Sequence, residues 1–238
     1  MNWKNDYLMA SANIDMLQIV AIGLEEIKND LVFVGGAVAE LYASDPASSD
    51  IRPTTDIDCL IELYSRTDYS RLEERLRAKG FVNDTSMGAP ICRWIYKNIK
   101  VEVMPTDEKI LGFSNQWYLE GIENKIGIAL PDGIEIFIFL PQYYLGAKFE
   151  ALKNRGGNDL RQSHDFEDLI YILDNCPDLL NDISKSNVRI SEYLKNECQN
   201  LLNNIAVREG IESALPYGSG DERVEIIEDL INDIAKIE

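Results

Sequence analysis

The sequence has few of the residues that build zinc sites and no segment suited to a membrane. It contains a single histidine, and its four cysteines (Cys59, Cys92, Cys176 and Cys198) form no Cys-x-x-Cys pair, which argues against a zinc knuckle. No stretch reaches the roughly 18 to 20 apolar residues that span a bilayer. The first residues also lack the charged-then-apolar layout of a signal peptide. We therefore expect a cytoplasmic protein with no membrane association and with free, mostly buried cysteines.

Basic residues are also scarce, since 23 Lys and Arg stand against 41 Asp and Glu, a formal net charge of −18. Proteins that grip a nucleic-acid backbone usually present a stripe of Lys and Arg. The basic residues are densest in residues 71–79, where they are interleaved with Glu73 and Glu74. This pattern is typical of a solvated helix face. The charge favours a small cationic molecule or a protein over nucleic acid as the partner.

The hydrophobic pattern predicts an α/β (α+β) fold, with a mixed β-sheet, flanking helices and a helical C-terminal region. Short β-branched runs predict strands at 31–34, 57–63, 91–96, 99–104, 127–130 and 133–139. Helical spacing predicts helices at 6–28, 69–79, 141–155, 165–175, 188–209 and 222–237. We therefore expect two domains, residues 1–140 and residues 141–238.

Three acidic residues in or next to the predicted strands are candidates for a site. Asp56 and Asp58 are two positions apart, so in a strand both side chains point to one side while Ile57 points to the other. Two like charges at such a short separation require a cation between them. A hard divalent ion such as Mg²⁺, completed by substrate phosphates, suits a short Asp-x-Asp pair. Glu102 is a lone acid in a later apolar strand, where an unpaired carboxylate is costly.

A glycine pair, Gly35 and Gly36, follows the first predicted strand and precedes an apparent helix start. Without a Cβ, backbone amides at such a turn can approach a phosphate closely. Glycine turns of this kind are also common as plain structure, and Glu102 could face solvent on an edge strand. The order of the glycine pair, the aspartate pair and the third acid favours metal-dependent nucleotidyl transfer, because two carboxylates can hold the ions and a third can ligate or act as general base.

This arrangement resembles the polymerase-β-type nucleotidyltransferase superfamily. Within it, Arg52-Pro53-Thr54-Thr55-Asp56-Ile57-Asp58 is similar to the Arg-x-Thr-x-Asp-Ile-Asp signature of the AbiEii-like nucleotidyltransferases, which are abortive-infection toxins. Residues 148–155 and 164–169 resemble the second conserved block of those proteins. The similarity covers residues 31 to 175. Two departures concern the third acid, which is Glu where Asp is commoner, and the acidic charge, which is unlike that of relatives that modify transfer RNA.

The resemblance implies a nucleotidyltransferase core that binds an NTP and Mg²⁺. It makes Asp56, Asp58 and Glu102 the catalytic and metal-binding carboxylates. It further implies nucleotide-binding roles for Gly35, Gly36, Arg52, Thr55, Lys148, Asp165 and Asp168. It also points to an antitoxin-like protein as a partner.

Two residues of the second block have alternative explanations. Lys148 could neutralise a triphosphate from the start of a helix, or it could be a surface lysine. His164 is most simply explained by a local hydrogen bond that caps the helix beginning at Asp165.

The favoured function is Mg²⁺-dependent transfer of a nucleoside monophosphate from an NTP to a hydroxyl of an unidentified acceptor. Two other functions stay open. A non-catalytic binding or regulatory protein of a toxin–antitoxin system would keep the fold, although the intact acidic residues argue against it. An enzyme that nucleotidylates an aminoglycoside-type antibiotic would suit the acidic charge, because its substrate is a polycation.

Overall fold

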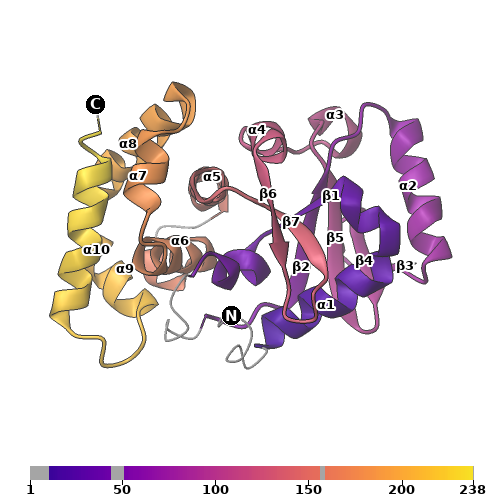
Figure 1. The fold of residues 1–238 in the computed structure, drawn as a ribbon, viewed down its shortest axis with the longest axis horizontal. Helices are drawn as coiled ribbons and strands as arrows, with labels where there is room; N and C mark the ends of the chain where they lie inside the picture. The colour runs from indigo at the N-terminus through magenta and orange to yellow at the C-terminus, as the bar shows by residue number, and fades with distance from the viewer. Residues whose placement is uncertain (1–10, 44–50, 156–158, 238) are drawn as a thin grey trace. The chain divides into compact units, whose positions relative to one another are not determined.

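The computed structural model describes residues 11–43, 51–155 and 159–237, and the chain divides into two compact units (Figure 1). The first unit takes in Met1–Val38 and Arg52–Phe139, and the second takes in Ala39–Ile51 and Leu140–Glu238. The whole β-sheet belongs to the first unit. Compared with the predicted division at residue 140, the segment 39–51 falls with the second unit.

The first unit is built on a seven-stranded sheet with the order β3-β4-β5-β2-β1-β7-β6. The strands are β1 (Leu31–Val34), β2 (Asp56–Ile61), β3 (Val82–Asn83), β4 (Arg93–Tyr96), β5 (Ile99–Pro105), β6 (Lys125–Ala129) and β7 (Glu135–Phe139). Strand β2 runs parallel to β5 and β1 runs parallel to β7, whereas the other neighbours are antiparallel. The sheet is therefore mixed, which confirms the predicted fold class.

Helices flank this sheet. They are α1 (Ala12–Leu24), α2 (Arg66–Ala78), α3 (Glu108–Leu111) and α4 (Tyr118–Glu123), with the 3₁₀ segment η2 (Glu25–Asp30). A further 3₁₀ segment, η3 (Gly36–Tyr42), begins in the first unit and ends in the second. Helix α1 lies against β2 and β5 (Figure 1). The predicted helix 6–28 starts outside the described residues, and its α-helical part ends at Leu24 because Glu25 adopts a φ of +49°. The short helices α3 and α4 were not predicted.

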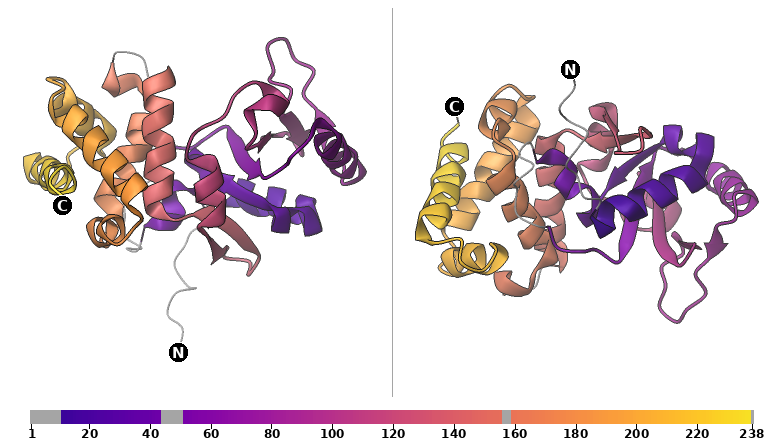
Figure 2. Two further views of the ribbon diagram at one scale, coloured as in Figure 1. Left: turned by 90° about the horizontal axis from the view of Figure 1, so that it is seen from above. Right: turned by 60° about the horizontal axis from the view of Figure 1, so that its bottom comes forward.

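The second unit is helical in its described part. Its elements are α5 (Pro141–Arg155), η4 (Leu160–Gln162), α6 (His164–Asn175), α7 (Leu179–Ser184), α8 (Val188–Leu202), α9 (Val207–Ala214) and α10 (Asp221–Ile234). Helix α5 packs against α6 and α8, and α10 packs against α6, α8 and α9 (Figure 2). The predicted helix 188–209 is two helices because the Asn204 side chain accepts a hydrogen bond from the Ala206 amide, which stabilises a turn.

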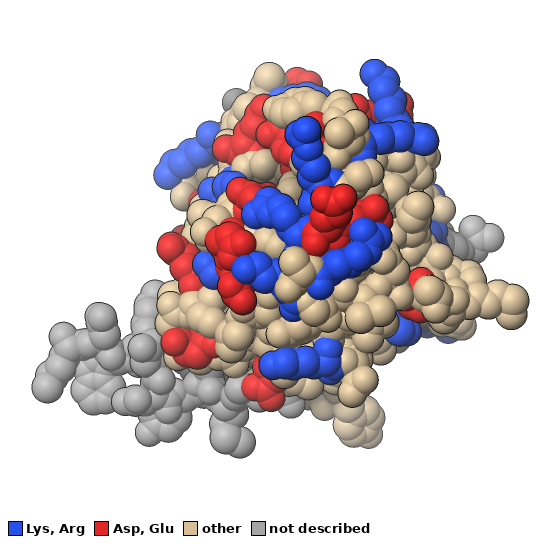
Figure 3. Space-filling view, turned by 90° about the vertical axis from the view of Figure 1, so that its right-hand side faces the viewer, with Lys and Arg blue, Asp and Glu red and all other residues tan. Residues whose placement is uncertain are grey.

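Charges of both signs alternate on the surface around α2 (Figure 3). The basic residues of this stretch are paired: Arg71 with Asp68, Arg75 with Asp30, Arg77 with Glu73, and Lys79 with Glu25 and Glu26. These pairs are at least partly exposed, so each contributes little to stability. The prediction that this stretch is a solvated helix face is confirmed.

Two expectations from composition can be compared with the structure. All four cysteines are free and buried, as predicted. Within the described ranges, no helix combines the length and the apolar character needed to cross a bilayer.

Candidate active site

Strand β2 places the two aspartates on one face of the sheet. Burial alternates along it: Ile57 and Cys59 are fully buried, whereas Asp56 and Asp58 are half-buried. Side chains two positions apart in a strand share a face, so both carboxylates point away from the side that buries Ile57 and Cys59. This orientation agrees with the spacing of the sequence.

The sheet register brings the third acid to the same face. In the parallel pairing of β2 with β5, Glu102 lies opposite Asp58 and Lys100 lies opposite Asp56. Residues directly opposite one another on neighbouring strands project from the same face. The alternative that Glu102 sits on an edge strand is wrong, because β5 lies between β4 and β2. Three carboxylates therefore share one sheet face.

Glu102 is bound by an arginine that the sequence interpretation missed. Arg93 lies opposite Glu102 in the antiparallel β4–β5 pair, and its Nε and Nη2 donate to Oε1 of Glu102 at 2.9 and 2.6 Å. The signal was present, because Lys97 and Asn98 separate the predicted strands 91–96 and 99–104, and counting outward from a two-residue turn there pairs Arg93 with Glu102. Both turn residues have positive φ, 46° and 66°, as a type I′ turn requires.

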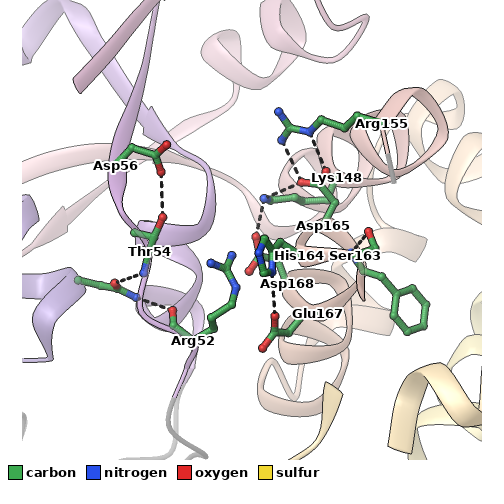
Figure 4. Close-up of polar contacts among 12 residues, drawn as sticks. Arg52, Thr54, Asp56, Lys148, Arg155, Ser163, His164, Asp165, Glu167 and Asp168 are labelled. Atoms are coloured by element: carbon green, nitrogen blue, oxygen red, sulfur yellow. Dashed lines mark hydrogen bonds and ion pairs between the residues drawn. The ribbon is translucent and has the colours of Figure 1, made fainter. Parts of the chain in front are cut away.

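The segment before β2 is tied to helix α1 by Asn13, whose side chain is buried. Its Nδ2 donates to the Arg52 carbonyl at 3.2 Å, and its Oδ1 accepts from the Thr54 amide at 2.9 Å (Figure 4). The Thr54 hydroxyl donates to Oδ1 of Asp56 at 2.9 Å. The Asp56 carboxylate is thereby oriented through a chain of contacts that starts in α1. Nothing in the sequence identified Asn13.

The predicted nucleotide contacts Arg52 and Thr55 flank this chain of contacts. Arg52 is half-buried and its Nη1 donates to the Pro53 carbonyl at 3.3 Å, whereas Thr55 is exposed. Their binding roles stay predictions.

Gly35 is required by a close approach to Asp58. Its φ is +75°, in the left-handed region, and a Cβ there would overlap Oδ2 of Asp58 and lie 3.0 Å from its Cγ. The next residue, Gly36, opens a 3₁₀ helix rather than the α-helix that its sequence suggested. Gly35 therefore supports the position of Asp58, and the contact of the glycine pair with a phosphate stays a prediction.

Replacing Gly35 by alanine should destabilise the protein by roughly 2 to 4 kcal/mol, because the new Cβ meets Asp58 and the left-handed backbone is strained. Thermal unfolding measures this loss. Gly133→Ala is the matched control: Gly133 has a φ of +83° and no atom within 4 Å of its added Cβ, so only the backbone strain applies. Equal losses in the two variants would contradict the contact with Asp58.

The second unit holds a separate group of charges around Lys148. Its Nζ donates to Oδ1 of Asp165 at 3.2 Å and to Oδ2 of Asp168 at 2.5 Å, and all three side chains are buried (Figure 4). Arg155, which is largely exposed, donates from Nε and Nη2 to Asp165 at 2.8 and 3.1 Å. The predicted residues Lys148, Asp165 and Asp168 thus contact one another directly.

Burial alone would lower the pKa of Lys148, but the carboxylates of Asp168 and Asp165 outweigh it and raise that pKa. Burial opposes ionisation of Asp165 in the same way, yet hydrogen bonds from Arg155 and Lys148 lower its pKa. Lys148 and Asp165 therefore favour their charged forms at neutral pH. The alternative that Lys148 is a surface lysine is wrong.

The helix that follows is capped by Ser163, not by His164 as predicted. Ser163 Oγ accepts a hydrogen bond from the Phe166 amide at 3.3 Å, the geometry of an N-cap residue and the third helical position. His164 is the first helical residue and is exposed, and its Nδ1 lies 3.4 Å from Oε2 of Glu167. The hydroxyl at the cap satisfies the helix amide, which leaves His164 without a capping role.

Two thiols lie near the carboxylates. Burial, aided by Glu102, raises the pKa of Cys92 to about 11. Burial, aided by Asp58, raises the pKa of Cys59 well above its usual range. Both side chains are therefore neutral thiols at physiological pH and are poor nucleophiles or metal ligands. The metal-binding donors of this region are therefore its carboxylates.

The carboxylates on the sheet face suit a hard cation that takes its remaining ligands from a substrate. In residues 11–43, 51–155 and 159–237, no group of three or more His, Cys, Asp or Glu side chains is arranged so that it could hold a metal ion. Asp56 and Asp58 offer only oxygen donors, which suit Mg²⁺. Mg²⁺ commonly takes one or two carboxylates from the protein and its other ligands from water and substrate phosphates. These residues therefore fit a metal–nucleotide complex better than a cage built by the protein alone.

Similarity to known proteins is found at the level of structure. No family model matches the sequence, and no curated protein matches it. Among solved structures, the chain is similar to an antigenic nucleotidyltransferase-like protein from Paracoccidioides brasiliensis. The two share 18% sequence identity with a TM-score of 0.49, over 86% of this chain and 94% of that chain.

Proposed function

We propose that this protein is a Mg²⁺-dependent nucleotidyltransferase that transfers a nucleoside monophosphate from an NTP to a hydroxyl of an acceptor. One observation carries the proposal: Asp56 and Asp58 share a face of β2, and Glu102 lies opposite Asp58 on β5. Like charges directly opposite on neighbouring strands are destabilising. Arg93 neutralises Glu102, and a bound cation would neutralise the aspartate pair.

Each residue has a defined part in this proposal. Asp56 and Asp58 would hold the ion, which would stabilise the leaving pyrophosphate and activate the acceptor oxygen. Thr54 orients Asp56 by its hydrogen bond, and Gly35 gives Asp58 the space it occupies. Glu102 would serve as a further ligand or would take the acceptor proton.

The residues that the sequence suggested as nucleotide contacts do not all have the same role in this proposal. Gly35, Gly36, Arg52 and Thr55 are proposed to contact the NTP through the segments that flank β1 and β2. For Lys148, the burial and the two carboxylate partners support a structural role in the second unit in place of a phosphate contact.

The acceptor is proposed from electrostatics. A protein with a net charge of −18 attracts cations at long range, which favours a small cationic molecule or a basic protein over nucleic acid. The finer assignment to AbiEii-like proteins, with an antitoxin-like partner, rests on the similarity of residues 52–58 and of the second block.

The deciding experiment titrates ATP, CTP, GTP and UTP into the wild-type protein by calorimetry, once with Mg²⁺ and once with EDTA. We expect at least one NTP to bind only with Mg²⁺. Labelled nucleotide should then appear on an acceptor from a panel of cationic antibiotics, basic proteins and RNA, with release of pyrophosphate. If no NTP binds with Mg²⁺ or Mn²⁺, the proposal is wrong and a non-catalytic binding protein becomes the better interpretation.

A further inference from the structure

Arg93 lies on the same sheet face as the three carboxylates. It is the first residue of β4 and lies opposite Glu102 in the β4–β5 pair, while Glu102 lies opposite Asp58 in the β5–β2 pair. One row across three neighbouring strands therefore carries an arginine, a glutamate and an aspartate. Arg93 lies at one end of this row, and Glu102 lies between Arg93 and Asp58.

The contact between Arg93 and Glu102 uses one carboxylate oxygen only. Nε and Nη2 of Arg93 both donate to Oε1, and no described residue donates a hydrogen bond to Oε2. The two side chains are 24% and 16% exposed, so solvent screens this pair less than a surface pair. A planar guanidinium with two donors fixes the orientation of its partner as well as attracting it.

The other charges near Glu102 would not hold it in this orientation. Asp58 on β2 repels it. Lys100 on β5 is exposed, and Asp84, after β3, is engaged by Ser86. The arginine is thus the described group that keeps this carboxylate beside the aspartate pair.

We propose that Arg93 is a positioning residue of the nucleotidyl-transfer reaction, an inference that rests on the proposed function. By occupying Oε1, it leaves Oε2 of Glu102 as the one oxygen presented toward the cation and the acceptor hydroxyl. Glu102 therefore acts through a single, fixed oxygen. Arg93 itself touches neither the substrate nor the ion.

The test is a double-mutant cycle read by Mn²⁺ binding, measured by electron paramagnetic resonance with a non-hydrolysable analogue of the NTP that the wild type binds. Arg93→Gln should weaken Mn²⁺ binding about 10- to 100-fold, the usual loss when a partner of a metal ligand is removed. Arg93→Lys should recover part of this loss, because lysine restores the positive charge but not the two fixed donors of the guanidinium. In a Glu102→Gln background, Arg93→Gln should change binding by less than about twofold, because its effect passes through Glu102.

Thermal unfolding of each variant reports whether it folds, and Arg75→Gln is the matched control, because Arg75 forms an exposed ion pair with Asp30. Arg75→Gln should leave Mn²⁺ binding unchanged. Wild-type affinity in a folded Arg93→Gln, or an equal loss in both backgrounds, would overturn the positioning role alone. Failure of the wild type to bind Mn²⁺ with any NTP would instead overturn the proposed function, and this inference with it.

Discussion

Replacing Asp56 and Asp58 together by asparagine should abolish metal-dependent NTP binding and lower nucleotidyl transfer at least about a thousandfold. The reason is charge, because asparagine keeps the shape of aspartate but cannot neutralise a divalent cation. A metal ion contributes several kcal/mol of charge stabilisation in the transition state, and each 1.36 kcal/mol is a factor of ten in rate. Calorimetry with Mg²⁺ and the NTP, followed by a labelled-nucleotide transfer assay, measures both losses.

The same substitution should leave the fold intact or make it more stable. Asp58 and Glu102 face each other on neighbouring strands, so removing one charge relieves repulsion. Glu73→Gln with Glu74→Gln on α2 is the matched control, since it removes two carboxylates from a solvated helix. This control should bind NTP as the wild type does. Retained metal-dependent binding in the asparagine variant would show that the cation binds elsewhere.

All the strands of the sheet except the two-residue β3 were predicted, because their signals are local. Leu31–Val34 is a run of four apolar residues, and all four are buried in β1. The spacing of Asp56 and Asp58 placed them on one face because a strand repeats every two residues. The pairing of β4 with β5 was also within reach, since Lys97 and Asn98 form the turn between them.

Features that depend on contacts distant in sequence could not be predicted. Asn13 holds residues 52 and 54, about forty positions away, and its own neighbours in sequence give no sign of this. The burial of Lys148 depends on Asp165 and Asp168, which lie on the next α-helix. Helix propensity alone cannot tell such a lysine from one in solvent. The short helices α3 and α4 carry too few residues to show a period.

The charge around the proposed site differs from that of the whole protein. Asp56, Asp58 and Glu102 share their sheet face with Arg93 and Lys100, so the local excess of negative charge is small. A bound divalent cation would reverse its sign. The net charge of −18 therefore acts on the approach of an acceptor more than on its contacts with this face, which is why the acceptor panel includes RNA beside cationic molecules.

Lys148→Met should destabilise the protein by about 3 to 5 kcal/mol, because it removes the ammonium that contacts buried Asp168 and one of the two cations bound to Asp165. The pKa of Asp165 is lowered in the folded protein, so the stability that this group provides is present above the unfolded pKa, near 3.8, and is lost as the pH falls. The deficit of the variant should therefore be largest at neutral pH and should shrink below about pH 4. Urea unfolding of both proteins across this range measures it.

The control is Lys153→Met on the same helix, where the lysine is half exposed and pairs with Glu150 and Glu197. Its loss should stay below about 1 kcal/mol, as for exposed ion pairs. Adding Asp168→Asn to Lys148→Met should restore part of the stability, because it removes a buried charge that has lost the lysine ammonium. A Lys148→Met variant that unfolds like the wild type but no longer binds NTP would contradict the structural role. Lys148 would then be the phosphate contact that the sequence had suggested.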